Sequence, residues 1–278
     1  MEKSRPKEKS SNFASEASVI MPSPSIPIAY SSAGIFSEEE LSLLSVGDIP
    51  QHVAVIMDGN RRWARGQGLE PMRGHWEGAE TLVDIVKAAA ELGVKTLTGY
   101  SFSTENWGRS KEEIDELMNI FEIYLHRKRE LMILEGIRFD WIGNLDEMPD
   151  RVKEAFILTK SATAHCEKIN LVLAVNYGGR DEIRRAFGKI LALNEQEKIS
   201  SDQLTEDLIA GFLDTARFGD PDLLIRTSGE YRVSNFLLWQ ISYAEFYTTE
   251  VLWPDFSSKH FYEAIVAFQG RMRRRGSR

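Results

Sequence analysis

The residues best suited to chemistry lie between His52 and His75, in the segment HVAVIMDGNRRWARGQGLEPMRGH. The apolar run at 53–57 is typical of a buried parallel strand, and it leads directly into Asp58, Gly59 and an Arg-rich stretch that predicts the start of a helix. In open α/β sheets, ligands bind outside the carboxyl ends of the strands, beside the positive end of the next helix. A carboxylate and two arginines at that place favour a metal ion and a ligand that carries phosphate groups.

Three more polar clusters follow apolar runs in the same way. They are residues 103–109 after LTGYSF, residues 176–180 after NLVLAV, and residues 226–235 after DLLI. Parallel strands place their carboxyl ends on one edge of a sheet, so we expect all four clusters to meet in one cleft.

Each cluster also has a simpler interpretation. Residues 58–60 suit a turn followed by a helix N-cap, and Asn106 suits a cap for the next helix. Trp63 and Trp107 suit plain packing inside the protein. Arg226 is harder to explain in this way, because an arginine that ends an apolar strand needs a partner.

Strand-like and helix-like segments alternate from residue 52 onward. Apolar stripes predict helices at 76–92, 111–135, 150–165, 180–193, 205–213 and 257–273. Short apolar runs predict strands at 53–57, 96–102, 138–142, 170–174 and 222–225. This alternation predicts an α/β domain with a parallel sheet that is covered by helices on both faces.

Composition excludes several classes of protein. Residues 1–45 are rich in Ser, Pro and Lys, and they predict a flexible tail before a folded domain at 46–278. The net charge of −8 argues against a nucleic-acid partner. Cys166 is the only cysteine, which excludes an internal disulfide and favours a reducing compartment. Apolar runs fall short of the ~18–20 residues of a membrane span, so we expect a cytoplasmic protein.

From His52 to the C-terminus the chain resembles the cis-prenyltransferase family, and within it the undecaprenyl diphosphate synthases. The matching motifs, in family order, are HVAVIMDGNRRWA, Gly74-His75, YSFSTENWGR, NYGGRDEI, DLLIRTSGEYRVSNFLLWQISYAE and VLWPDF. The resemblance implies a single α/β catalytic domain with a central parallel sheet of about six strands flanked by helices, and a homodimer. It also implies Mg²⁺-dependent cis-condensation of isopentenyl diphosphate units onto farnesyl diphosphate. The product would be a long polyprenyl diphosphate such as undecaprenyl diphosphate, a lipid carrier precursor for cell-wall glycans.

The resemblance also implies roles for individual residues. Asp58 and Glu245 would be the carboxylates associated with magnesium. Asn106 would accept the C2 proton of isopentenyl diphosphate. A carboxamide is a poor base, so we expect Asn106 to orient or relay, with Asp58 or the released diphosphate taking the proton. The residues implied to bind the two substrates are Gly59, Asn60, Arg61, Arg62, Trp63, His75, Ser103, Thr104, Glu105, Trp107, Arg109, Arg226, Arg232, Val233 and Ser234. The growing chain needs apolar walls, for which the helices at 76–92 and 111–135 are the natural candidates.

The chain departs from the family pattern in two places. Many members have an arginine where this chain has Pro71, and Arg73 is a candidate replacement. Some members have a histidine near the metal where this chain has Tyr231. The C-terminal residues 274–276 (RRG) resemble a family motif that reaches toward isopentenyl diphosphate, although a solvated basic end is the simpler interpretation.

Two other classes of protein share some of these features. A haloacid-dehalogenase-type phosphatase also begins with a strand that ends in Asp, but it needs a second Asp two residues later, where this chain has Asn60. A non-catalytic scaffold subunit would lack the loop around Asp58 and much of the segment before Asn106, and this chain has both. We therefore expect an enzyme that contacts the membrane only transiently, for the release of its product.

Overall fold

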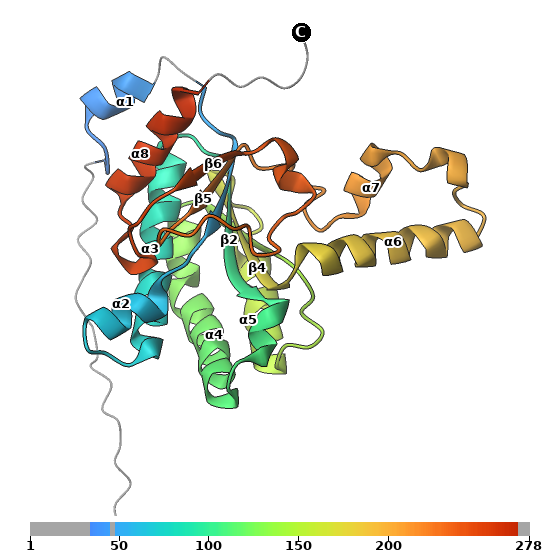
Figure 1. Cartoon of the computed structure of the whole chain (residues 1–278), viewed down its shortest axis with the longest axis horizontal. Coiled ribbons are helices and arrows are strands. Elements are labelled where there is room, and N and C mark those ends of the chain that lie inside the picture. The colour runs from blue at the N-terminus through green and yellow to red at the C-terminus, as the bar shows by residue number, and fades with distance from the viewer. Residues whose placement is uncertain (1–33, 45–47, 272–278) are drawn as a thin grey trace, which may run out of the picture. The chain divides into compact units, whose positions relative to one another are not determined.

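The computed structural model describes residues 34–44 and 48–271, and a six-stranded parallel sheet forms its centre (Figure 1). The strands are β1 (His52–Ile56), β2 (Thr96–Ser103), β3 (Ile137–Ile142), β4 (Ile169–Tyr177), β5 (Leu223–Arg226) and β6 (Glu245–Thr248). Their order is β3-β4-β2-β1-β5-β6, so β1 lies where the direction of strand addition reverses. The expected single α/β domain with a parallel sheet of about six strands is confirmed.

Helices of very different lengths connect the strands. The α-helices are α1 (Glu38–Leu44), α2 (Asn60–Gly66), α3 (Pro71–Glu91), α4 (Lys111–Leu134), α5 (Asp150–Ala162), α6 (Gly179–Glu195), α7 (Glu206–Phe212) and α8 (Ser258–Gln269). Short 3₁₀ helices are η1 (Thr104–Gly108), η2 (Ser201–Gln203), η3 (Gln240–Tyr243) and η4 (Trp253–Asp255). None of the helices within the described ranges is both long and apolar enough to cross a membrane.

Three expectations about the elements need correction. Helix α3 begins at Pro71 instead of residue 76, since proline is well suited to the first helical position. Gly74 and His75 are consequently helical residues. Strand β6 was not among the strands expected from apolar runs, because its side chains are only partly buried at the edge of the sheet. Helix α8 ends at Gln269, before the expected end at 273.

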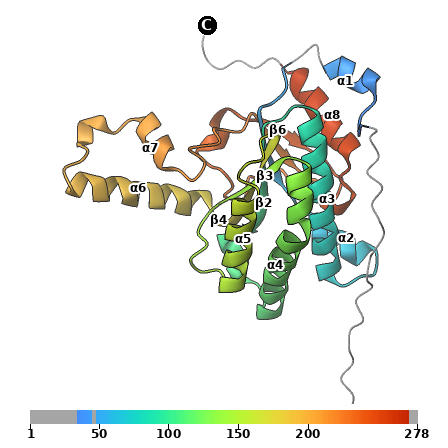
Figure 2. The ribbon, with the colours of Figure 1, turned by 180° about the vertical axis from the view of Figure 1, so that it is seen from behind.

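The two faces of the sheet are covered differently. Helices α3, α4, α5 and α8 lie over one face, as Figure 2 shows, while α6 and α7 extend away from the sheet. The opposite face carries a smaller apolar cluster, in which Phe236, Leu237 and Ile241 from the β5–β6 connection pack against Ala54 and Leu224. The expectation that helices cover both faces of the sheet is therefore met only in part, because an irregular segment with three apolar anchors covers part of the second face.

Residues 34–44 belong to the folded domain. Phe36 and Leu44 are buried in the main core, and the backbone N–H groups of Ile35 and Phe36 donate to the carboxylate of Glu91 at 2.9 and 3.0 Å. The expected end of the flexible tail at residue 45 is therefore wrong for these residues. Residues 1–33, on which the rest of that expectation falls, lie outside the described residues.

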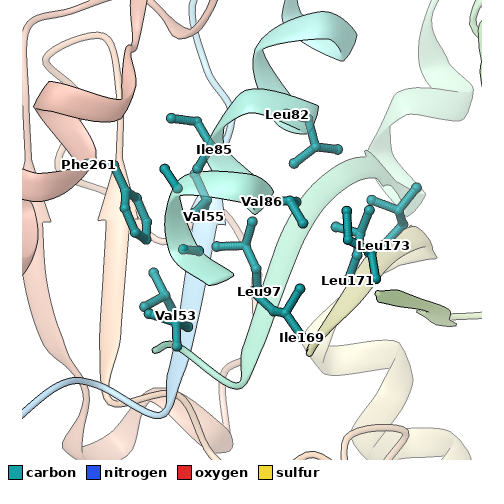
Figure 3. Close-up of a cluster of buried hydrophobic side chains, with 14 of the residues drawn as sticks. Val53, Val55, Leu82, Ile85, Val86, Leu97, Ile169, Leu171, Leu173 and Phe261 are labelled. Carbon is teal, nitrogen blue, oxygen red and sulfur yellow. The ribbon is translucent and has the colours of Figure 1, made fainter. Parts of the chain in front are cut away.

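The main core fixes α3 against the sheet (Figure 3). Leu82, Ile85 and Val86 of α3 pack onto Val53 and Val55 of β1. Each fully buried aliphatic side chain contributes about 1.5–3 kcal/mol relative to an exposed one. The helix that carries His75 is thus held on the strand that ends at Asp58.

His52 lies at the end of β1 opposite to Asp58, and its burial makes stability depend on pH. Its Nδ1 is 3.0 Å from the carbonyl oxygen of Gly219 and its Nε2 is 2.7 Å from the hydroxyl oxygen of Thr98. Burial lowers the pKa of His52 from its ordinary value to about 4. Between pH 6.5 and 4 the unfolded chain therefore binds a proton that the folded chain does not, so stability falls as pH falls through this window.

We expect His52→Gln to reduce the loss of stability at acid pH. For a pKa lowered from 6.5 to about 4, the loss caused by His52 amounts to about 3 kcal/mol once the pH is below both values. Denaturant unfolding at pH 7 and pH 5 measures the effect. His126→Gln, at an exposed position on α4, is the matched control. An equal loss of stability between the two pH values in wild type and His52→Gln would contradict the prediction. His75 is shifted in the same direction, so part of the acid dependence remains in the variant.

Candidate active site

A cavity of about 540 Å³ is lined by the carboxyl edge of the sheet and by α3 and α4. The polar side chains that line it are Asp58, Asn60, His75, Tyr100, Ser101, Ser103, Glu105, Asn106, Arg109, Arg226, Ser234 and Asn235. The predicted clusters after β1, β2 and β5 therefore meet in one place. The cluster after β4 lies beside them, because the backbone N–H groups of Gly179 and Arg180 donate to Asn235.

The remainder of the cavity wall is apolar. Helices α3 and α4 and the sheet contribute Ala79, Leu82, Phe102, Leu117, Ile120, Phe121, Leu125, Met132, Leu171 and Leu173. Along α4 the lining runs from Leu117 to Met132, a rise of roughly 22 Å at 1.5 Å per residue. The helices expected to supply apolar walls do so, and the cavity joins a charged end to a long apolar end.

The charged end is organised by an ion pair between neighbouring strands. Nη2 of Arg226 lies 2.8 Å from Oδ2 of Asp58, and the arginine side chain is only 6% exposed. Nη1 of Arg226 donates to the hydroxyl of Ser234 at 2.8 Å and to the carbonyl oxygen of Arg232. The backbone N–H of Asp58 donates to the hydroxyl of Thr227 at 3.0 Å. The end of β1 and the loop after β5 are thereby locked together.

Further guanidinium groups surround this pair. Nη2 of Arg62 lies 3.6 Å from Oδ1 of Asp58, and Arg62 also donates to the carbonyl and hydroxyl oxygens of Ser228. Arg61 faces α4, where Glu113 pairs with it at 3.5 Å and with Arg109 at 2.8 Å. Several arginines close to one carboxylate form a place where a diphosphate would be attracted.

His75 lies between these groups and the apolar wall. Burial, together with the positive charges of Arg109 and Arg61, lowers the pKa of His75 to about 4, against the opposite effect of Glu113. The imidazole is consequently neutral at physiological pH. It can offer a ligand a hydrogen bond without carrying charge.

Three polar atoms at the cavity lack a partner. Oδ1 of Asn60, Nε2 of His75 and Nε of Arg226 are buried, and no group in the described part of the chain bonds to them. All three residues line the cavity. Buried polar atoms are normally satisfied, so their grouping here indicates that a polar ligand completes the site.

The loop after β2 is fixed by its own hydrogen bonds. Oδ1 of Asn106 accepts from the backbone N–H of Ser103 at 3.0 Å, in a capping box at the start of η1. This bond fixes the orientation of the Asn106 carboxamide. Burial alone would raise the pKa of Glu105, but hydrogen bonds from Asn235 and neighbouring groups bring it below its ordinary value.

Some of the predicted residues lie outside the cavity lining. Trp63 donates to the carboxylate of Asp255 at 2.7 Å, and Trp107 donates to Oδ1 of Asn176 at 2.8 Å. Each indole N–H therefore ties its segment to another loop, and Trp107 also packs edge-on against Phe102, as the simpler interpretation expected. Val233 packs against the cluster on the second face of the sheet.

Other residues that the sequence placed near the site lie at the protein surface. Arg232 pairs with Glu230 and is largely solvent-exposed. Arg73 pairs with Glu77 at 2.9 Å on α3 and does not line the cavity, so the structure gives no support to its replacing the arginine absent at Pro71. Tyr231 is exposed. The C-terminal residues 274–276 lie outside the described residues.

Glu245 is displaced from the expected place. It lies beside Leu223 at the beginning of β5, whereas Arg226 at the end of β5 lies beside Ile56, close to Asp58. Its carboxylate accepts from Arg271 at 2.9 Å. Within a single chain the parallel register therefore places Glu245 at the amino ends of the strands and Asp58 at the carboxyl ends, so the two carboxylates expected at one metal ion do not meet there.

Two cavity residues were given no role by the sequence. Asn235 follows Ser234 in the cluster after β5, and its amide bridges to Glu105 at 2.8 Å. Tyr100 donates to the carbonyl oxygens of Tyr177 and Ser234 at 3.2 and 3.3 Å. Burial raises the pKa of Tyr100, so its hydroxyl stays protonated. The position of Asn235 within a polar cluster was the available signal, whereas Tyr100 sits in an apolar run.

Comparison with known proteins supplies the family. A family model described as undecaprenyl diphosphate synthase matches residues 56–276. The chain belongs to this family. It is a prenyltransferase of the cis type.

Individual relatives agree over most of the chain. An isoprenyl transferase of Chlamydia pneumoniae is 48% identical over 236 residues, covering 84% of this chain and 94% of that protein. The ditrans,polycis-undecaprenyl-diphosphate synthase ((2E,6E)-farnesyl-diphosphate specific) of Micrococcus luteus is 42% identical over 233 residues, covering 84% and 94%.

Solved structures show the same fold. Lavandulyl diphosphate synthase from Lavandula x intermedia, in complex with dimethylallyl diphosphate, is similar with a TM-score of 0.81 and 37% identity, covering 82% of this chain and 99% of that one. A probable undecaprenyl diphosphate synthase from Campylobacter jejuni gives a TM-score of 0.70 and 33% identity, covering 83% and 100%.

The close contact of α3 with the Asp58 loop generates a prediction. A Cβ at Gly74 would lie 2.0 Å from the carbonyl oxygen of Asn60, whereas a Cβ at Gly66 would have no neighbour within 4 Å. We expect Gly74→Ala to displace the backbone of Asn60, with a loss of stability of about 1–3 kcal/mol and of most prenyltransferase activity. Gly66→Ala is the matched control, since it adds the same methyl group in open space. It should leave the activity unchanged and leave stability unchanged or slightly higher. Denaturant unfolding and turnover of the two variants check this, and equal behaviour would show that the contact does not position the loop.

Proposed function

We propose that this chain performs the Mg²⁺-dependent, sequential cis-condensation of isopentenyl diphosphate onto farnesyl diphosphate. The observation that carries the proposal is a single cavity with an arginine-rich end, three unpartnered buried polar atoms and a long apolar remainder. An allylic diphosphate has the same two-part character. The farnesyl specificity in the name of the Micrococcus luteus relative supports the choice of primer.

The residues at the polar end suit the departure of diphosphate. The C1–O bond of the allylic substrate breaks, and its electron pair leaves with the diphosphate. Arg62 and Arg226 are placed near Asp58 to stabilise that charge through paired N–H donors. The π electrons of isopentenyl diphosphate then form the new bond from C4 to C1. Loss of the C2 proton leaves its electron pair in the new double bond.

The proton needs an acceptor close to Asn106. The amide oxygen of Asn106 is bonded to the backbone N–H of Ser103, so we assign this residue to orientation. The departing diphosphate or the carboxylate of Asp58 is then the group that takes the proton. Ser103 and Glu105 line the same part of the cavity and limit how isopentenyl diphosphate can lie there.

The side chains around Asp58 suit a magnesium ion that is bound partly by the protein and partly by the substrate. Mg²⁺ is commonly bound through one or two carboxylates together with phosphate oxygens and water. Asp58 is such a carboxylate, and the described residues contain no cluster of three or more His, Cys, Asp or Glu side chains able to form a protein cage. When bound at Asp58, the ion would supply neutralisation of the diphosphate charge.

The charge of Asp58 is the first thing to test. Asp58→Asn retains the size of the side chain and an acceptor for Arg226. We expect it to lower turnover by about 10²–10³-fold, the usual cost of losing one preorganised electrostatic group. Turnover is measured with labelled isopentenyl diphosphate, farnesyl diphosphate and Mg²⁺, followed by chain-length analysis. EDTA should abolish the reaction and added Mg²⁺ restore it.

Asp207→Ala, at an exposed position on α7, is the control and should retain wild-type turnover. A folded Asp58→Asn protein with wild-type turnover would remove Asp58 from the mechanism. A wild-type protein that is indifferent to EDTA would contradict the proposed dependence on magnesium.

We further propose that the chain forms a homodimer and meets the membrane only when product leaves. The proposed homodimer is supported by two exposed apolar side chains, Phe187 and Leu191, which lie one turn apart on α6, the helix that extends from the sheet. Release of a polyprenyl product into water is unfavourable, since the transfer of each methylene group out of water is favourable by about 0.8 kcal/mol. Product release is thus proposed to limit the rate.

If release is slow, detergent or lipid vesicles should accelerate steady-state turnover without changing the first condensation. Single-turnover and steady-state rates, each measured with and without detergent, separate the two steps. Equal stimulation of both rates would show that release is not rate-limiting.

A further inference from the structure

Asn235 joins the loops that follow three strands of the sheet. Its Nδ2 donates to Oε1 of Glu105 at 2.8 Å, in η1 after β2. Its Oδ1 accepts from the backbone N–H of Arg180 at 3.0 Å, and its backbone oxygen accepts from Gly179 at 2.6 Å, both after β4. Asn235 itself lies in the loop after β5, next to Ser234. One side chain therefore spans the carboxyl edge of the sheet.

The surroundings of Asn235 are shaped for this contact. A Cβ at Gly178 would lie 2.7 Å from both Nδ2 of Asn235 and Oγ1 of Thr104, so a side chain there would displace the Asn235 amide from its present position. Asn235 has a φ of 62°, in the left-handed region, which asparagine adopts more readily than most residues. Asparagine also supplies one donor and one acceptor from the same group, as the two contacts require.

The contact connects two parts of the proposed reaction site. Glu105 directly precedes Asn106, the residue assigned to orientation. Ser234 directly precedes Asn235, and its hydroxyl accepts from Arg226 at 2.8 Å. Displacement of Asn235 would change the separation between these parts without removing any group that contacts substrate in the proposed mechanism.

We infer that Asn235 is a positioning residue for condensation, which acts through Glu105 to hold the Asn106 loop against the loop that follows β5. The inference rests on the proposed function, because it requires both substrates to lie at this edge. It adds a role that the sequence motif alone did not assign. The ionised form of Glu105 is the better acceptor, and the lowered pKa of that carboxyl agrees with this arrangement.

The test is Asn235→Asp. This variant keeps the side-chain shape, the tolerance of a left-handed backbone and the acceptor for Arg180, but it places a second negative oxygen against Glu105. We expect kcat to fall by about 10- to 100-fold, the range for losing a hydrogen bond to a charged group, with little change in the KM for either substrate. Asn194→Asp at the exposed end of α6, where Nδ2 donates to the carbonyl oxygen of Ile199, is the matched control, because it loses a comparable hydrogen bond away from the cavity and should retain wild-type kcat.

A double-mutant cycle with Glu105→Gln separates positioning from a general structural effect. In the Glu105→Gln background, the glutamine amide can donate to the new aspartate, so Asn235→Asp should cost far less than it does in wild type. The same fold-loss in both backgrounds would overturn the inference, and so would wild-type kcat in Asn235→Asp. If Asn235→Asp does not fold, Asn235→Gly, which keeps the backbone conformation, takes its place in the same cycle.

The two proposals fail in different ways. A wild-type protein that does not condense isopentenyl diphosphate contradicts the proposed function. An active wild-type protein whose Asn235 variants show additive losses, or none, contradicts only the positioning role.

Discussion

The ion pair between Arg226 and Asp58 is the interaction on which the site depends. A guanidinium group that is almost fully buried needs a carboxylate and further acceptors, and Asp58, Ser234 and the backbone of residue 232 provide them. These groups lie in the segments that follow β1 and β5, two strands that are neighbours in space and far apart in sequence. The pair therefore couples folding of the sheet to assembly of the charged end. It also keeps arginine donors ready in a place where a diphosphate can compete for them.

The remaining features follow from placing that charged pair beside an apolar wall. Helix α3 packs on β1 through its inner face, and its first turns carry Gly74 and His75 to the Asp58 loop. Helix α4 continues the wall and contributes Glu113, which pairs with two arginines near the polar end. Polar and apolar parts of a substrate would consequently be separated along one direction. Helices α3 and α4 and the sheet supply the apolar part, and loops at the carboxyl ends of the strands supply much of the polar part.

The sequence predicted the parts of the site that follow directly from a strand end. Asp58, Asn106 and Arg226 each come after an apolar run, and the rule for parallel sheets is sufficient to bring them together. The position of Glu245 was not predictable in this way, because it depends on the register of β6, a short and partly exposed edge strand. The start of α3 was missed because the apolar stripe begins after Pro71. The bridging role of Asn235 depends on contacts between three loops, which no periodicity in the sequence records.

The wall that α3 and α4 share with the core has a consequence for how this protein can evolve. Leu82, Leu117 and Met132 line the cavity and are also members of the main hydrophobic core. A smaller residue at such a position would enlarge the space for product, but it would also remove core contacts at a cost of about 2–5 kcal/mol for a change to alanine. Lineages that acquire longer products would therefore need compensating substitutions elsewhere, whereas those that shorten the product could gain stability by filling space. Cavity volume and fold stability are thus coupled at these positions.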